Sequence, residues 1–97
     1  MGYVYLMKPV GHNVYKIGET INIEKRMARM QKKKDYELEL VTAVEITREI
    51  QWQVEHRLHD HYKRYRLASE WFALPEDAVT NFVELARYIE KGISDTL

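Results

Sequence analysis

Two short segments near the start of the chain place a phenol and an amine where they could act together. Residues 3–7 and 14–18 alternate β-branched, aromatic and other side chains around a cluster of turn-forming residues, which predicts a β-hairpin. Because successive side chains of a strand point to opposite faces, Tyr5 and Lys16 are expected to emerge side by side on the outer face of the sheet. A phenol and an ammonium group beside Gly18 are unusual for packing alone, so this pair is a candidate for chemistry.

An acid at the edge of a buried helix stripe is the second candidate. Apolar residues recur at positions 50, 54, 58 and 62 after Thr47, a residue that can cap a helix, and they predict a long helix. Glu55 borders this stripe, and His59 lies one turn further along the same side. Desolvation penalises a charged carboxylate in such a place unless it has a partner. Pairing with Arg26 or Lys16 is the structural alternative to a functional role for Glu55.

A basic helix is predicted after the hairpin. Asn22 is a favourable N-cap, apolar residues at 23, 27 and 30 form one stripe, and the lysines at 32–34 close the helix. Arg26 and Arg29 lie off the apolar stripe. Arg29 and Lys33 are candidate DNA contacts, although a solvated helix end is slightly the better interpretation of the lysine run.

The 15 basic and 15 acidic residues cancel, but they are unevenly distributed along the chain. The net charge is +6 over residues 1–34, −5 over 35–55, +3 over 56–66 and −4 over 67–97. Such blocks can still present a positive face to phosphates. Scattered, solvated charge is the alternative interpretation.

Three more elements complete the expected domain. Alternation between positions 38 and 46 predicts a third strand whose even-numbered side chains share one face. The segment 69–72 is interpreted as a turn and a short extended piece, in which Trp71 and Phe72 pack in the core. Glu70, in the same segment, has either a structural or a functional role. A last helix from Pro75 to Gly92 is expected to cover the sheet.

The length and composition indicate one domain over residues 1–97. No apolar run approaches the roughly 20 residues that span a bilayer, and no signal peptide is recognisable, so a cytoplasmic location without membrane contact is expected. The chain has no cysteine, which excludes disulfides and thiolate zinc sites.

The order of these residues resembles the GIY-YIG nuclease superfamily, in the compact variant with Tyr-Lys-Ile-Gly and Glu-Trp-Phe that is found in phage and viral proteins. Val4-Tyr5 and Ile17-Gly18 stand for the two halves of the motif that names the family. The matching residues that follow are Arg26, eight positions after Gly18, then Glu55, Leu58-His59 and Glu70-Trp71-Phe72. The resemblance implies an α+β fold, with a small three-stranded antiparallel sheet flanked by about three helices.

The resemblance also implies metal-dependent hydrolysis of DNA phosphodiester bonds. One Mg²⁺ (or Mn²⁺) ion would be held by Glu55, a hard oxygen ligand, and would stabilise the leaving oxygen. Tyr5 would act as general base on the attacking water, with its pKa lowered by Lys16 and the ion. Arg26 would bind the non-bridging phosphate oxygens, while His59 would shuttle a proton or hold a phosphate. DNA is the expected partner, and a second copy of the chain or another protein would supply specificity.

The chain departs from the family pattern at three positions. The second tyrosine of the motif falls on Lys16, while Tyr15 is one residue away, and strand alternation favours Lys16 as the site residue. Glu19 stands where many relatives carry a lysine. The late asparagine of the family has no counterpart, although Glu70 lies in that region.

Two other functions are weighed against a nuclease. A DNA- or protein-binding module on the same fold would use this surface without cleavage. A zinc site made of His56, His59 and His61 is disfavoured, because His61 points away from the other two on a helix.

Overall fold

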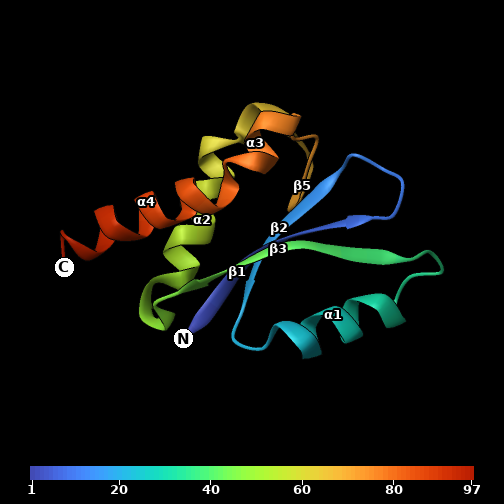
Figure 1. Cartoon of the computed structure of the whole chain (residues 1–97), viewed down its shortest axis with the longest axis horizontal. Helices are drawn as coiled ribbons and strands as arrows, with labels where there is room; N and C mark the ends of the chain where they lie inside the picture. The colour runs from blue at the N-terminus through green and yellow to red at the C-terminus, as the bar shows by residue number, and fades with distance from the viewer.

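A five-stranded antiparallel sheet runs through the molecule, in the strand order β3-β1-β2-β5-β4 (Figure 1). The computed structural model describes residues 1–97. Its strands are β1 (Gly2–Pro9), β2 (Tyr15–Thr20), β3 (Leu38–Ile46), β4 (Arg66–Ala68) and β5 (Trp71–Phe72). Its helices are α1 (Ile23–Lys32), α2 (Gln51–His61), α3 (Glu76–Thr80) and α4 (Phe82–Ser94), with 3₁₀ turns on either side of α2 at Arg48–Ile50 and Lys63–Tyr65.

The α+β class is confirmed, but the expected numbers of strands and helices are wrong. β4 and β5 extend the three predicted strands beyond β2, and they have three and two residues, too few to give a visible alternation in the sequence. The predicted last helix is two helices that meet at Asn81, so there are four α-helices. The second of them continues past Gly92, because Ile93 packs in the core.

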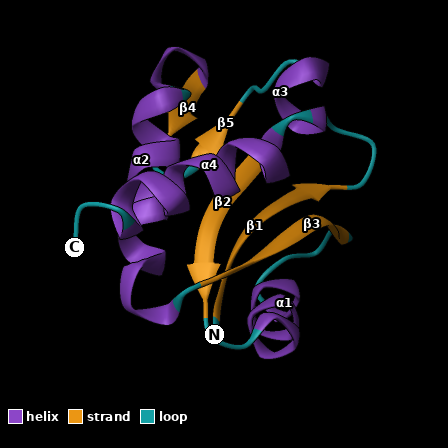
Figure 2. Ribbon diagram, turned by 60° about the vertical axis from the view of Figure 1, so that its left-hand side comes forward, coloured by secondary structure: helices purple, strands orange, loops and turns teal.

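The two faces of the sheet are covered unequally. α2 and α4 lie against one face, with α3 beside them, while α1 alone lies against the other (Figure 2). The first face buries a cluster of 16 residues, which we call the main core, whereas the second face buries only Tyr5, Met7 and Leu38. The expectation that Tyr5 emerges on an outer face is therefore wrong, because α1 covers it and leaves it 0% exposed.

A β-bulge interrupts the predicted alternation in β3. Leu6 pairs with Thr42 but Met7 pairs with Leu40, so Val41 is an extra residue in β3. Because of the bulge, even-numbered residues of β3 before and after Val41 point to opposite faces of the sheet. Leu38 packs under α1, while Val44 and Ile46 face the main core. The expectation of a single shared face is therefore wrong.

The start of α1 follows its sequence signal, whereas the start of α2 does not. The Asn22 side chain accepts a hydrogen bond of 3.0 Å from the Lys25 amide and caps α1 as predicted. Thr47 makes no such cap, because its amide and hydroxyl both donate to Glu90 of α4, at 2.7 and 3.0 Å. Neither helix, nor any other here, has the length and hydrophobicity that crossing a bilayer requires.

Candidate metal and phosphate site

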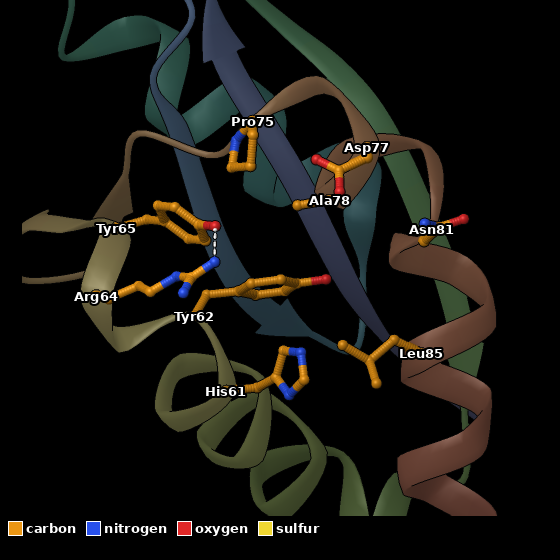
Figure 3. A pocket seen from close by; sticks show the side chains of 9 residues that line it. All are labelled: His61, Tyr62, Arg64, Tyr65, Pro75, Asp77, Ala78, Asn81 and Leu85. Carbon is orange, nitrogen blue, oxygen red and sulfur yellow. Dashed lines mark hydrogen bonds between the residues drawn. The ribbon is translucent and has the colours of Figure 1, made fainter.

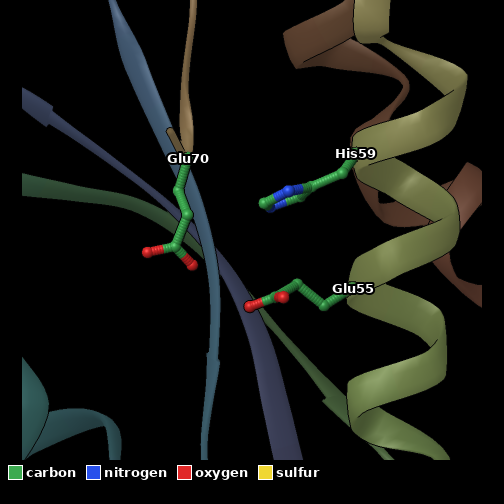
Figure 4. A group of neighbouring side chains, drawn as sticks. All are labelled: Glu55, His59 and Glu70. Carbon is green, nitrogen blue, oxygen red and sulfur yellow. The ribbon is translucent and has the colours of Figure 1, made fainter. Parts of the chain in front are cut away.

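Two acids and a histidine converge where α2 passes the edge of β2 (Figure 4). Glu55 and His59 project from successive turns of α2, and Glu70 reaches them from the turn between β4 and β5. One potential ligand atom from each residue lies within 4.8 Å of those of the other two. The helical spacing predicted the first two as neighbours. The sequence left the role of Glu70 open, and the structure places its carboxylate in the same cluster.

His59 is oriented by the backbone of β2. Its Nε2 lies 2.9 Å from the carbonyl oxygen of Ile17, and since a carbonyl can only accept, Nε2 carries the proton and donates it. The Ile17 amide is bonded to the carbonyl of Glu70, at 3.1 Å. In neutral His59 the lone pair is then on Nδ1, and this fixed tautomer is the arrangement found in metal-ligating histidines.

Tyr5 and Arg26 form the part of the site beneath α1. Arg26 Nη1 donates a hydrogen bond to the Tyr5 hydroxyl at 3.3 Å, so the arginine predicted to lie off the apolar stripe reaches the phenol. The Tyr5 ring lies over Gly18. It fits there only because glycine has no Cβ, which at that position would overlap the ring. Burial raises the pKa of Tyr5, which the hydrogen bond and charge of Arg26 lower, and which the charges of Glu70 and Glu55 raise further.

Lys16 joins the hairpin of β1 and β2 to the acidic cluster. Its Nζ lies 3.1 Å from Glu70 Oε2, and 13% of the Lys16 side chain is exposed. Tyr15, the neighbouring alternative, belongs to the main core on the opposite face. The strand alternation that favoured Lys16 over Tyr15 therefore agrees with the geometry, although the chemical role of Lys16 stays a prediction.

Glu55 carries the largest electrostatic cost of the site. Burial raises its pKa to about 7, Glu70 and then Glu19 push it up, and Lys16 and Arg26 oppose the rise. The charged form is therefore disfavoured until a positive charge compensates for it. A divalent cation is such a charge, and carboxylate oxygens with an imidazole nitrogen are donors that suit a small divalent cation.

Glu19 and Gln51 are polar neighbours of the site that the sequence did not reveal as a pair. Gln51 Nε2 donates to Glu19 Oε1 at 2.6 Å, while Gln51 Oε1 is buried without a partner. Glu19 pairs with the core residue Val4 across the sheet, so its side chain faces α2. Gln51 and Glu55 lie one turn apart on that helix. The alternation of β2 was the available signal, because it puts Glu19 on the same side as the core residue Ile17.

Several other predicted residues lie outside this cluster. Arg29 and Lys33 are exposed on α1 and at its end, and neither is hydrogen-bonded or paired through its side chain. Among the three residues of the cluster, His56 is paired only with Glu55, with Nε2 at 3.8 Å from Oε1, and His61 packs edge-on against Tyr62. Of the three histidines, only His59 belongs to a group of possible metal ligands.

A hollow of about 470 Å³ lies away from the cluster, between the end of α2 and the helices α3 and α4 (Figure 3). Its lining residues are His61, Tyr62, Arg64, Tyr65, Pro75, Asp77, Ala78, Asn81 and Leu85. Burial raises the pKa of Tyr62, and Asp77 and Tyr65 raise it further. None of the residues predicted to do chemistry lines this hollow, so the candidate site is defined by its side chains rather than by a deep cavity.

Comparisons with known proteins identify the family. Residues 2–87, nearly the whole chain, match the T5orf172 domain. No curated protein and no solved structure gives a significant match. This domain is phage-associated and nuclease-like, which is consistent with a nuclease or a DNA-binding module. The chain therefore belongs to the T5orf172 domain family.

Proposed function

We propose that this protein is a DNA endonuclease of the GIY-YIG type that hydrolyses phosphodiester bonds with the help of one divalent ion. The observation that carries the proposal is the meeting of Glu55, His59 and Glu70 with the pair of Tyr5 and Arg26 at one edge of the sheet. Ligands for a cation and cations for a phosphate are thus within electrostatic reach of one another. Membership of a nuclease-like domain family supports the same conclusion.

Glu55 would hold the ion, with Glu70 and His59 as additional donors. Mg²⁺ or Mn²⁺ bound there would neutralise the phosphate and stabilise the leaving oxygen. The buried position of Glu55 supports this role, because a carboxylate that is costly to ionise alone gains most from a cation. Lys16, paired with Glu70 at 3.1 Å, would exchange that partner for a phosphate oxygen of the DNA.

Arg26 and Tyr5 would act on the phosphate and the attacking water. Arg26 is partly exposed beside Tyr5, and its guanidinium has donors left for the non-bridging oxygens as their charge grows. Tyr5 would accept the proton of the water at its hydroxyl oxygen. Its pKa is raised even with the opposing effect of Arg26, which keeps the phenol protonated at neutral pH, so the bound cation would have to lower that pKa for Tyr5 to act as a base. Arg29 and Lys33, further along α1, would contact the DNA backbone.

A binding module without catalysis is the second candidate function, and two observations favour it. The raised pKa of Tyr5 opposes a general base, and the ion pair of Lys16 with Glu70 occupies a potential metal ligand. Such a module would use the basic side chains of α1 to hold DNA and would leave it intact.

Incubation with supercoiled plasmid and Mg²⁺ or Mn²⁺ tests the proposal. The wild-type protein should nick or linearise the plasmid, and Glu55→Gln and Tyr5→Phe should each reduce the rate by about 100-fold or more. Glu84→Gln is the control, because Glu84 is an exposed acid on α4 and is not part of the cluster, and it should leave the rate unchanged. Equal rates for wild type and Glu55→Gln would overturn the proposal. A shifted DNA band without cleavage by the wild type would establish the binding module instead.

A further inference from the structure

A row of aromatic rings runs along α2 into the candidate site. Trp52, His56 and His59 lie at positions i, i+4 and i+7, so they share one side of the helix. The ring centroids of Trp52 and His56 are 4.0 Å apart, and those of His56 and His59 are 6.1 Å apart. His59 then meets the core residue Phe72 edge-on, at 5.1 Å. The row therefore leads from solvent to the interior.

The outer end of the row is open to solvent. Trp52 is 60% exposed, and the side chain of His56 is 53% exposed. Tryptophan is highly buried on average, so an indole with this exposure offers a large flat face for a ligand. The His56 ring lies against one side of the indole, and the exposed remainder is available to a ligand.

The inner end of the row belongs to the candidate site. His59 is a member of the acidic cluster, and His56 lies 3.8 Å from the Glu55 carboxylate. A flat group stacked on Trp52 would consequently lie only two side chains from the residues that would hold the cation.

A hollow of about 420 Å³ adjoins Trp52, between α2 and the end of α4. Arg57 provides a cation on its rim, Asp60 is an acid there, and Ile93 and Leu97 are apolar. An exposed indole with a nearby guanidinium matches a nucleotide, whose base stacks and whose phosphate carries negative charge.

We infer that Trp52 and His56 form a stacking surface for unpaired bases, which makes single-stranded or branched DNA the substrate class of the site. The inference rests on the proposed function. In an uninterrupted duplex the face of each base is covered by its neighbours, so only an unpaired base can lie on Trp52. Stacking on an aromatic side chain tolerates any sequence and fixes the position of the adjoining phosphate.

The fluorescence of Trp52 tests the inference directly. The chain has two tryptophans, so Trp71→Phe leaves Trp52 as the only reporter. In EDTA, which prevents cleavage, an oligothymidylate should quench this fluorescence. A relaxed, covalently closed circular duplex should not, because it has no ends and no unpaired base, and an abasic oligonucleotide of the same length should not, because it has no bases.

Variants of Trp52 provide a second measurement that does not depend on the Trp71 substitution. In anisotropy titrations of a labelled oligothymidylate, Trp52→Ala should raise Kd about 5- to 150-fold, the range that one base–aromatic stack contributes. Trp52→Phe should retain most of the affinity. Tyr88→Ala is the control, because Tyr88 is an aromatic residue 76% exposed on α4, and it should leave Kd unchanged.

Three results would overturn the inference: equal binding of the abasic oligonucleotide, an unchanged Kd for Trp52→Ala, or burial of Trp52 by self-association without DNA. The last result would identify a second copy of the chain as the occupant. Because the titrations need no metal, they separate the two proposals. Plasmid cleavage without stacking would overturn only the inference, and stacking by a protein that never cleaves would overturn only the nuclease.

Discussion

The two faces of the sheet differ in how many residues they bury and in which candidate site residues they hold. The face under α2 and α4 buries 16 residues that hold the fold together, while the face under α1 buries three. One of those three is Tyr5, and the helix that covers it brings Arg26. The layer under α1 thus desolvates Tyr5, while the larger core under α2 and α4 supplies most of the buried apolar surface.

The candidate site has residues from both faces of the sheet, because β2 extends beyond its short neighbour β5. β5 pairs only with Tyr15 and Lys16, so the end of β2 is an open edge. Glu55 approaches that edge from the face under α2 and α4, while Tyr5 and Arg26 approach it from the face under α1. Neither layer therefore holds the whole candidate site.

Truncation in the main core should have the largest effect on stability. Phe82→Ala removes a ring that is 0% exposed, and it should lower the free energy of unfolding by about 3–5 kcal/mol. Met27→Ala truncates a partly buried side chain on the face under α1, and it should lower the free energy of unfolding by less than about 2 kcal/mol. Urea unfolding of the two variants measures the difference. Equal losses would show that the two faces contribute alike.

Titration of Glu55 should have the next largest effect. Its pKa is about 7 in the folded protein, above its ordinary value of 4.5, so the folded state binds the proton more tightly than the unfolded chain. The contribution of Glu55 to the free energy of unfolding is therefore fully present below about pH 4.5. It is lost as the pH rises through about 7, which lowers the free energy of unfolding by up to about 3 kcal/mol.

Thermal unfolding from pH 4.5 to 8.5 measures this fall. Glu55→Gln should remove it and should be the more stable protein at pH 8. Addition of Mg²⁺ or Mn²⁺ at pH 8 should stabilise the wild type, EDTA should reverse the gain, and the variant should not respond. A wild type that gains stability between pH 5 and 8 would contradict the assignment.

Loss of the cap of α1 should have the smallest effect. Asn22→Ala removes the acceptor for the Lys25 amide and should cost about 1 kcal/mol. Because α1 positions Arg26, cleavage should fall as well, by less than about tenfold. Asn13→Ala, in the exposed loop between β1 and β2, is the control for both measurements. Equal stability of the two variants would mean that the cap does not hold α1.

The sequence predicted what short-range periodicity determines. The hairpin, α1 with its cap at Asn22, the apolar stripe of α2 and the shared side of Glu55 and His59 all follow from local spacing. The covering of Tyr5, the bulge at Val41 and the arrival of Glu70 do not. They depend on contacts between distant segments, such as the pair of Lys16 and Glu70, 54 positions apart, and no local pattern encodes these.

Glu70 lies at the turn of the shortest hairpin of the sheet. The β4–β5 hairpin has strands of three and two residues, β4 is exposed throughout, and Ser69 at its turn has a positive φ of 50°. Such a hairpin can open locally while the rest stays folded, and under the proposed function each opening would withdraw one ligand from the other two. Apparent metal affinity would then scale with the fraction of time the hairpin is closed, so a substitution that tightens the hairpin would strengthen binding without altering any ligand.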